Sequence, residues 1–250
     1  IALSSMWIPL TFQESVGRHR RLFFGMAWIP LGVTFFAFIL GYVYSWLRGE
    51  DYLPFALYLF AGYMSWQYIQ SCIQGGFGLF SRASRTIENS QLPYSYFISK
   101  HVTEQLLQFL LAIPFFLAAR QIIDPGFTLN MLLMLPAFII YVVTGLAVST
   151  MFAFLSMRYR DLETPVSMGL RIMFLFTPII WLVESKSGTK RAMFIEYNPF
   201  YHFLEIMRAP LLGQTPDAIS WIIACAFCLF FSISAFLTFI LARGRIAYWV

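Results

Sequence analysis

Four charged side chains fall within six positions of the sequence, at Arg158, Arg160, Asp161 and Glu163, although only 12% of the 250 residues are charged. Charges of both signs at this spacing can pair with neighbouring elements or contact a charged partner surface. Each arginine or aspartate at the centre of a membrane helix costs about 2.5–3.5 kcal/mol, so submerging all four in lipid would cost roughly 10 kcal/mol. This turn is therefore expected to lie at a surface.

Residues suited to catalysis are scattered along the chain. His19, His101 and His202 lie in segments that the topology predicted below puts on both sides of a membrane, so they cannot form one cluster. The sequence contains no G-x-x-x-x-G-K-[ST] phosphate loop, no HExxH motif and no G-x-S-x-G nucleophile elbow. Cys225 and Cys228 have CxxC spacing, but they lie in an apolar run without further ligands nearby, which favours packing. We expect no catalytic residue and no metal site.

The elements that must position these residues are long apolar segments. Hydrophobic residues make up 59% of the chain and aromatic residues 19%, with a mean hydropathy of +0.70. Such a composition is typical of an integral membrane protein. The runs are continuous and lack the period of two of barrel strands, so we predict an all-α protein with six transmembrane helices. The spans predicted within a single transmembrane domain (1–250) are 24–47, 53–78, 102–119, 129–156, 165–183 and 218–242.

Span length and proline content qualify this prediction. About 20 helical residues at a rise of about 1.5 Å cross a hydrocarbon core of about 30 Å, and only the third and fifth runs are marginal. These two carry Glu104 and Arg171, which either snorkel to the cytoplasmic surface or face a transport path. We interpret five prolines as kinks, because neighbouring helices can satisfy the freed carbonyls. They are Pro30, Pro54, Pro114, Pro136 and Pro178.

Lysines and arginines in the loops predict the orientation in the membrane. The side that holds the N-terminus carries ten of them, namely Arg18, Arg20, Arg21, Arg82, Arg85, Lys100, Arg158, Arg160, Arg243 and Arg245. The opposite side carries six, and seven acidic residues offset them. Both termini are therefore predicted to be cytoplasmic. The net charge of +5 reflects this topology and attraction to membrane lipid, so it requires no nucleic-acid partner.

Two further segments are too short to span a membrane. Residues 1–21 carry scattered apolar residues followed by GRHRR, which is typical of a helix in the cytoplasmic interface or of a disordered lead-in. The stretch NPFYHFLEIMRAPLLG at 198–213 is apolar but short, which predicts re-entrant helices between spans five and six. Glu205 and Arg208 within it are three residues apart and can pair on one helix face.

Five stretches in this order resemble the permease subunit of type-2 ABC exporters. They are RRLFFGMAW before span one, TIENSQLPYSYFISK in the second cytoplasmic segment, RYRDLETP after span four, FLFTPIIW in span five, and NPFYHFLEIMRAPLLG after it. Of these, RYRD is the most specific. The resemblance is to the branch that exports lipid-linked polysaccharides such as O-antigen, capsule and teichoic acid. It covers nearly the whole chain and implies a place in the bacterial cytoplasmic (inner) membrane.

The resemblance implies a second copy of the permease and two separate cytoplasmic ATP-binding-cassette ATPases, with ATP and Mg²⁺ on the ATPases and no cofactor in this chain. It also implies a main coupling helix at about 82–91. The residues of the implied ATPase-facing surface are Arg18, Arg20, Arg21, Arg82, Arg85, Glu88, Arg158, Tyr159, Arg160 and Asp161. The charges of the RYRD turn either transmit ATPase-driven movement into the adjoining helices or brace the loop between them.

The implied cargo is a lipid-linked glycan, and sugar rings stack their C–H faces on aromatic side chains. Candidate channel-lining residues are Trp28, Tyr42, Trp46, Phe174, Trp181, Tyr197 and Tyr201. Tryptophan and tyrosine also collect at membrane interfaces for other reasons, so each candidate has that alternative. The residues that the resemblance assigns to helices dipping into the external leaflet are Asn198, Pro199, Glu205 and Arg208.

Other functions stay open at this level. An ABC exporter of a drug or a small lipid would have the same architecture. An ion-coupled secondary transporter tends to carry acidic residues near the bilayer midplane, and the mid-span regions here contain none. A membrane enzyme would need intramembrane acids or bases, for which only Glu104 and Arg171 are candidates. We therefore predict a permease that takes its energy from an ATPase partner.

Overall fold

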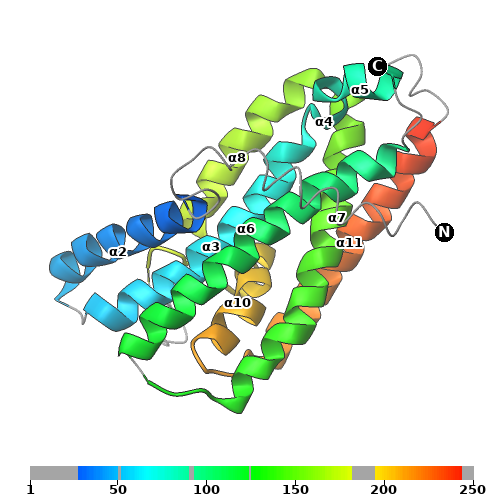
Figure 1. The fold of residues 1–250 in the computed structure, drawn as a ribbon. Helices are drawn as coiled ribbons and strands as arrows, with labels where there is room; N and C mark the ends of the chain where they lie inside the picture. Colours follow the sequence, from blue (N-terminus) through cyan, green and yellow to red (C-terminus); the bar gives the residue numbers. More distant parts are fainter. Residues whose placement is uncertain (1–27, 50–51, 90–92, 124, 182–194, 244–250) are drawn as a thin grey trace.

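The computed structural model describes residues 28–49, 52–89, 93–123, 125–181 and 195–243. All regular elements in these ranges are helical, which confirms the all-α prediction. Six longer helices form one elongated bundle (Figure 1): α2 (Trp28–Arg48), α3 (Tyr52–Gly76), α6 (Tyr94–Ile123), α7 (Met134–Arg158), α8 (Glu163–Phe176) and α11 (Ala218–Arg243). The shorter elements are α4 (Leu79–Arg82), α5 (Ser84–Asn89), η2 (Leu129–Leu133), η3 (Arg160–Leu162) and α10 (Pro199–Leu211).

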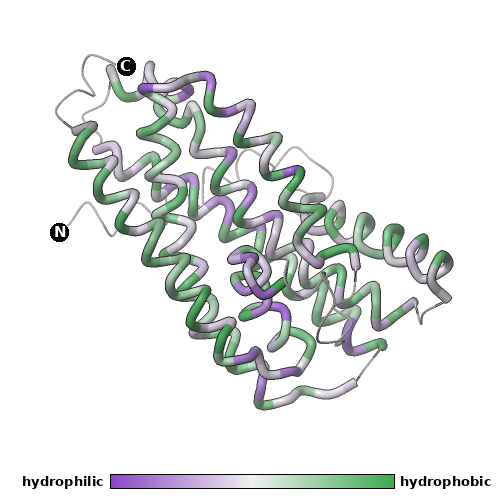
Figure 2. The backbone as a smooth tube through the Cα atoms, turned by 180° about the vertical axis from the view of Figure 1, so that it is seen from behind, coloured by the Kyte–Doolittle hydropathy of each residue, from purple (hydrophilic) through white to green (hydrophobic). Residues whose placement is uncertain are grey.

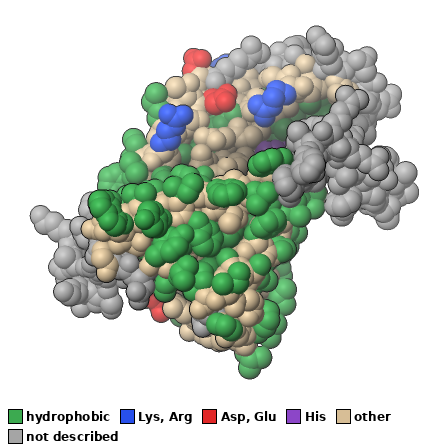
Figure 3. Space-filling model, turned by 60° about the vertical axis from the view of Figure 1, so that its left-hand side comes forward, with side chains coloured by type: hydrophobic (Ala, Val, Ile, Leu, Met, Phe, Trp, Pro, Cys, Tyr) green, Lys and Arg blue, Asp and Glu red, His purple; other side chains and the backbone are tan. Residues whose placement is uncertain are grey.

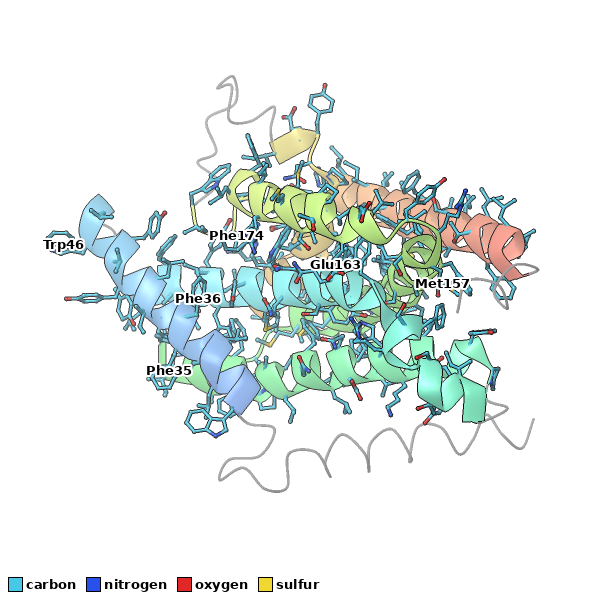
Figure 4. The ribbon with its side chains drawn as sticks, turned by 90° about the horizontal axis from the view of Figure 1, so that it is seen from above. Phe35, Phe36, Trp46, Met157, Glu163 and Phe174 are labelled. Carbon is cyan, nitrogen blue, oxygen red and sulfur yellow. The ribbon has the colours of Figure 1, made fainter. Side chains whose placement is uncertain are left out.

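Helix α3 forms the centre of the bundle. It contacts α2, α6, α7, α8 and α10, and 15 of its 25 residues are buried. In contrast, α2 packs against α3 and α6 and leaves much of its apolar surface uncovered. Figure 4 shows Trp46 at the far end of α2, where 77% of its surface is exposed. An apolar helix face of this kind suits contact with lipid or with another protein chain.

Several polar groups inside the bundle find partners within it. The Tyr68 hydroxyl on α3 donates a hydrogen bond to the Tyr141 carbonyl on α7 at 2.9 Å, and the Tyr141 hydroxyl donates to the Phe203 carbonyl on α10 at 3.1 Å. The rings of Tyr141 and Phe203 also stack, with centroids 4.3 Å apart. Because lipid offers no hydrogen-bond partners, such internal pairing is required. These contacts tie α3, α7 and α10 together.

Four helical stretches are long and apolar enough to cross a membrane: Pro30–Leu47, Tyr94–Ile123, Leu129–Arg158 and Ala218–Leu241. Two predicted spans are not among them. Helix α3 is long enough but less apolar, since it carries several glutamines. Helix α8 has only 14 residues, about 21 Å at the helical rise.

The prediction that span five continues as a helix to residue 183 is wrong. Helix α8 ends at Phe176, and Thr177 has the extended backbone angles φ −81° and ψ 132°. The residue before a proline is pushed out of the helical region by the proline ring, and Pro178 follows directly. The segment 177–181 is consequently non-helical.

Helix α6 is longer than the predicted span 102–119. It runs from Tyr94 to Ile123, 30 residues in total. It begins directly after Pro93, whose carbonyl accepts a hydrogen bond from the Tyr96 amide at 2.9 Å. Apolarity alone missed these first turns because they contain serine, lysine and histidine. Glu104 therefore lies about three turns into the helix and not at its start.

The interpretation of prolines as kinks is wrong for four of the five. Pro30, Pro54 and Pro136 lie in the first turns of α2, α3 and α7, where the missing N–H loses no helical hydrogen bond. Pro178 lies beyond the end of α8. Of the five, Pro114 lies inside a helix.

Candidate functional site

Two groups of the residues singled out from the sequence lie toward opposite ends of the bundle. The first, which we call the RYRD end, comprises α4, α5, the end of α7, η3 and the start of α8 (Figure 1). Helix α10 lies toward the opposite end. On the face shown in Figure 3 the visible Lys and Arg side chains lie toward one end, and the middle of that face is largely hydrophobic.

Gly78 starts the turn that carries α4. Its backbone has φ 63° and ψ 13°, a left-handed conformation that glycine adopts without steric cost. Its amide donates a hydrogen bond to the Ser156 hydroxyl on α7 at 3.1 Å. Phe80 is 1% exposed and packs on Phe154 of α7, with ring centroids 5.2 Å apart. These contacts fix α4 to the end of α7, just before Arg158.

The described charged side chains of the RYRD end, those of Arg82, Arg158, Asp161 and Glu163, are exposed. Arg82 donates a hydrogen bond from Nη2 to the Gly75 carbonyl at 2.7 Å, which satisfies a carbonyl near the end of α3. The Arg158 guanidinium lies 5.4 Å from the centre of the Tyr159 ring, and Asp161 lies exposed in η3. The exposed cations and anions of this end are available to a partner surface.

The coupling role of the range 82–91 stays a prediction. The structure has helix α5 within this range, from Ser84 to Asn89, separated by a break from α4, which ends at Arg82. The break falls at Ala83, which has φ −98° and ψ 3°. Arg85 and Glu88 belong to α5 and Arg160 to η3, but their side chains lie outside the described part of the structure. The predicted interface helix at 1–21 also lies outside it, together with the arginines that it holds, Arg18, Arg20 and Arg21.

Substituting Gly78 by alanine is expected to destabilise the RYRD end by about 1–2 kcal/mol, the cost of a left-handed conformation with a side chain. The measurement is the thermal unfolding midpoint of the purified protein. Gly32→Ala is the matched control, because a Cβ there meets no atom within 4 Å, and alanine should favour helix α2. Equal midpoints for the two variants would contradict the role of Gly78.

Helix α10 begins with a complete cap. The Asn198 side chain accepts a hydrogen bond from the Phe200 amide at 3.0 Å, and Pro199 occupies the first helical turn. The same side chain donates to the Thr177 hydroxyl, just past α8, at 3.0 Å. Asn198 thus starts one helix and joins it to the end of another.

Arg208 is a buried cation at this end, with 2% of its surface exposed. Its Nε donates to Glu205 at 2.8 Å, and Nη2 bonds to the same carboxylate, which confirms the pairing predicted from their spacing. Its Nη1 donates to the Pro178 carbonyl at 2.7 Å. The guanidinium also lies over the rings of Tyr58 and Tyr201, at 4.2 and 5.6 Å from their centres. We call these five residues the Arg208 cluster.

The Arg208 guanidinium stays charged although it is buried. Burial, the largest single effect, lowers the pKa of Arg208, but the Glu205 carboxylate and the neighbouring tyrosines Tyr58 and Tyr201 together outweigh burial, so the pKa lies above its ordinary value. For Tyr201, burial and then Glu205 raise the pKa of the phenol, which stays neutral. Figure 2 shows the hydrophilic stretch of α10 in a bundle of mostly hydrophobic helices. The cluster is therefore a fixed ion pair that locks α10 to the segment after α8.

The seven candidate channel-lining aromatics lie on several elements. Trp28, Tyr42 and Trp46 are exposed on α2, and Tyr197 is exposed just before α10. Phe174 on α8 lies well away from Trp46 (Figure 4).

Three of these aromatics pack against the protein itself. The Phe174 ring packs on Tyr63 and Trp66 of α3, with centroids 6.1 and 5.8 Å apart. Trp181 donates a hydrogen bond to the Leu175 carbonyl at 3.2 Å, and Tyr201 belongs to the Arg208 cluster. Within one copy of the chain, Phe174 packs on α3, and the seven candidate channel-lining residues do not share one surface.

Metal-ligating side chains do not cluster in the described ranges, where no three of His, Cys, Asp and Glu lie close enough to hold an ion. His202 is instead engaged in hydrogen bonds at 3.0 Å with the Ser220 hydroxyl and the Glu196 carbonyl. Its place is structural, at the contact of α10 with α11.

Comparison with known protein families matches residues 10–212 to the family described as ABC-2 type transporter. The chain belongs to this family. Among similar proteins, the O-antigen export system permease protein RfbA of Klebsiella pneumoniae is 26% identical over 198 residues, which cover 79% of this chain and 76% of that protein. A protein of the same name from Myxococcus xanthus is 22% identical over 213 residues, covering 84% and 82%.

Membership of the ABC-2 type transporter family makes the chain a multi-pass membrane protein and a transport subunit. The matched range contains both the RYRD end and the Arg208 cluster. Sequence reasoning identified Arg208 and Glu205 but missed Tyr58 and the Pro178 carbonyl, which lie 150 and 30 positions before Arg208. It also passed over glutamines inside apolar helices, and their rarity in such helices was a usable signal.

Proposed function

We propose that this ABC-2 transporter is the permease of an exporter that carries lipid-linked, O-antigen-like polysaccharide across the bacterial inner membrane. The observation that carries the proposal is similarity to permeases named for O-antigen export over at least three quarters of both chains. Family membership supports transport in general, and these relatives support the class of cargo. The aromatic side chains exposed on α2 are suited to weak contacts with sugar rings.

The energy source in this proposal is a pair of ATPase subunits that bind ATP and Mg²⁺, acting on two copies of the permease. These 250 residues contain no phosphate-binding loop, and the proposal places the nucleotide on a separate ATPase. The exposed charges of the RYRD end, with Arg82, Arg158 and Asp161, are suited to contact with a cytoplasmic protein. The uncovered apolar face of α2 is suited to a second copy or to lipid.

The proposed topology has six spans, α2, α3, α6, α7, α8 and α11, with both termini cytoplasmic and α10 as the re-entrant helix. The short α8 is compatible with spanning because segment 177–181 continues it inside the protein. Non-helical backbone is tolerated at membrane depth when its polar groups are satisfied. The Pro178 carbonyl accepts hydrogen bonds from Tyr58 and Arg208, at 3.1 and 2.7 Å.

The proposal is tested by purifying the full chain from its native host and by deleting it there. An ATPase is expected to co-purify, and the deletion strain is expected to retain the lipid-linked polysaccharide on the cytoplasmic side. A drug or small-lipid exporter would leave polysaccharide export intact. Transport by the isolated chain that stops when the proton gradient collapses would instead identify an ion-coupled carrier.

Reversing the charge of Asp161 tests the coupling role of the RYRD end. Asp161→Arg is expected to reduce export at least about tenfold, since a like charge placed across an interface costs several kcal/mol and 1.4 kcal/mol is tenfold. Export is measured as surface polysaccharide in the complemented deletion strain. Asp217→Arg, an exposed acid at the opposite end, is the matched control. Normal export by Asp161→Arg would leave this turn without an essential role.

A further inference from the structure

A row of polar side chains runs along α8 from the RYRD end toward the middle of the helix. It consists of the polar residues of this helix, which are Glu163, Thr164, Ser167 and Arg171. With 3.6 residues per turn, all of them fall within about 100° of the helix surface. We call this the α8 polar row. Arg171 ends the row, and its side chain is exposed.

Arg171 lies among exposed apolar side chains. Met168, Ile172 and Leu175 are 59%, 52% and 64% exposed, and of the 14 residues of α8 one, Leu170, is buried. In the proposed topology this part of α8 crosses the membrane. A charged side chain within a membrane helix is costly, and it normally has a functional partner.

The described residues offer Arg171 no anion. It forms no ion pair and no hydrogen bond with any of them. Helix α3, on which α8 packs, contains no acidic residue. The acid of α8 itself is Glu163, eight positions earlier and about 12 Å away along the axis, which is well beyond ion-pair distance. The guanidinium therefore has its full binding capacity available to a ligand.

Helix α3 carries a second polar row on the side that contacts α8. The Trp66 indole donates a hydrogen bond to Gln70 at 2.6 Å, and the Gln70 amide donates to Gln74 at 3.4 Å. The three residues are four positions apart and share one helix face. Trp66 on this face packs on Phe174 of α8, with ring centroids 5.8 Å apart. A primary amide has two N–H donors, so Gln70 has one left for a ligand.

Gln70 and Arg171 lie at the same level of the bundle. The two helices are antiparallel, because Tyr58 near the start of α3 donates a hydrogen bond to the Pro178 carbonyl beyond the end of α8. From the ring contact between the helices, Gln70 lies one turn further along α3 and Arg171 one turn back along α8. Both steps lead toward the RYRD end, where Figure 4 labels Glu163 at the start of α8.

The depth of Arg171 suits the phosphate group of a lipid. Its Cα lies about 12 Å below Glu163 along the helix axis, and side chains on a helix lean toward its N-terminus, here the RYRD end. The head-group layer of a bilayer is about 5–8 Å thick. The guanidinium thus lies near the inner edge of this layer. Its planar fork binds phosphate through two parallel hydrogen bonds.

A second copy of the chain is a poorer source of the anion. Helices α2, α3, α7 and α11 contain no aspartate or glutamate, so in a copy packed against α8 these helices present no carboxylate at this depth. Glu104 on α6 already has a partner within its own chain.

We propose that Arg171 binds the phosphate group of a glycolipid that enters beside α8 from the cytoplasmic side, with Gln70 and Ser167 as neutral donors to the phosphate oxygens. Thr164 and Glu163, nearer the RYRD end, suit the hydroxyls of the sugar attached to the phosphate. A carboxylate there accepts hydrogen bonds from hydroxyls and repels a further anion. The apolar side chains beyond Arg171 suit the lipid tail. The inference rests on the proposed function, because the natural ligand is then the exported lipid-linked glycan.

The test uses the full chain in nanodiscs of phosphatidylglycerol, together with any ATPase that co-purifies. The probe is glucose joined through a phosphodiester to a dodecyl chain with a photoreactive diazirine beside the phosphate. Labelled peptides are expected from α8 around Arg171 and from α3 around Gln70. The same compound without the diazirine should compete, whereas dodecyl maltoside, which has a sugar head group and the same tail but no phosphate, should not.

Two variants of Arg171 and one control decide the result. Arg171→Met should lower labelling at least about tenfold, because it removes two hydrogen bonds from a charged donor. Arg171→Lys keeps the charge without the fork and should retain part of the labelling. Both should melt like the native chain, since the side chain is exposed and unpaired among the described residues. Lys100→Met, which removes a cation from α6 instead, is the matched control and should label normally.

Each outcome bears on the inference. Unchanged labelling of Arg171→Met, or displacement by dodecyl maltoside, would overturn it. Labelling in phosphatidylcholine nanodiscs that phosphatidylglycerol abolishes would identify an ordinary membrane phosphate as the ligand and also overturn it. So would loss of self-association in Arg171→Met with labelling unchanged, because a second copy would then supply the anion.

The inference and the proposed function can fail separately. If polysaccharide export requires the chain but labelling does not depend on Arg171, the inference alone is rejected. If labelling depends on Arg171 but deletion of the chain leaves polysaccharide export intact, the proposed function alone is rejected.

Discussion

Replacing Arg208 by methionine is expected to lower the free energy of unfolding by about 3–5 kcal/mol, the range seen when one partner of a buried ion pair is removed. The substitution leaves Glu205 without its cation and leaves the Pro178 carbonyl with one hydrogen bond fewer. It also removes the guanidinium from the face of the Tyr58 ring. The measurement is thermal unfolding of the purified protein, read as the midpoint and the yield of folded material.

Two further variants make this prediction specific. Arg171→Met changes an exposed arginine on α8 in the same way and should shift the free energy of unfolding by at most about 0.5 kcal/mol. The double variant Arg208→Met/Glu205→Gln removes both charges and should be more stable than Arg208→Met alone. If Arg208→Met unfolds at the same temperature as Arg171→Met, the Arg208 cluster does not stabilise the fold.

Adding one methyl group at Gly145 should destabilise the bundle by about 2–4 kcal/mol, the combined cost of overpacking and a broken hydrogen bond. A Cβ at this buried position of α7 would lie 2.0 Å from the Tyr68 hydroxyl. That hydroxyl is held by its hydrogen bond to the Tyr141 carbonyl, so Tyr68 cannot move away without losing it. Thermal unfolding of Gly145→Ala measures the effect.

The control for Gly145→Ala is Gly169→Ala on α8, where an added Cβ meets no atom within 4 Å. It should leave stability unchanged or raise it slightly. Tyr68→Phe removes the oxygen that clashes with a Cβ at position 145. Gly145→Ala should therefore destabilise the Tyr68→Phe variant less than it destabilises the native chain. Additive losses would show that the two positions do not interact.

Helix existence followed from the sequence, and the errors lay in the ends of helices. Long apolar runs predicted α2, α7 and α11 within a few residues, because apolar side chains on every face leave few alternatives to a membrane helix. The predicted end of α8 was wrong because the effect of Pro178 on Thr177 is local and opposes the apolar pattern. The start of α6 was missed because its first turns are polar.

The sequence predicted part of the candidate site as well. The pairing of Glu205 with Arg208 follows from helical spacing, and the RYRD turn follows from the cost of charges in lipid. The surroundings of Arg208 do not, since Tyr58 and Pro178 come from other elements of the fold.

By itself, the sequence determined that this is an all-helical membrane protein whose motifs resemble a transporter family, because hydrophobicity depends on composition and order along the chain. The tertiary structure alone decided that Arg208 is the buried centre of a lock on α10 and that Asn198 joins the start of α10 to the end of α8. Those features depend on contacts between residues distant in sequence, and such contacts exist only once the helices have packed.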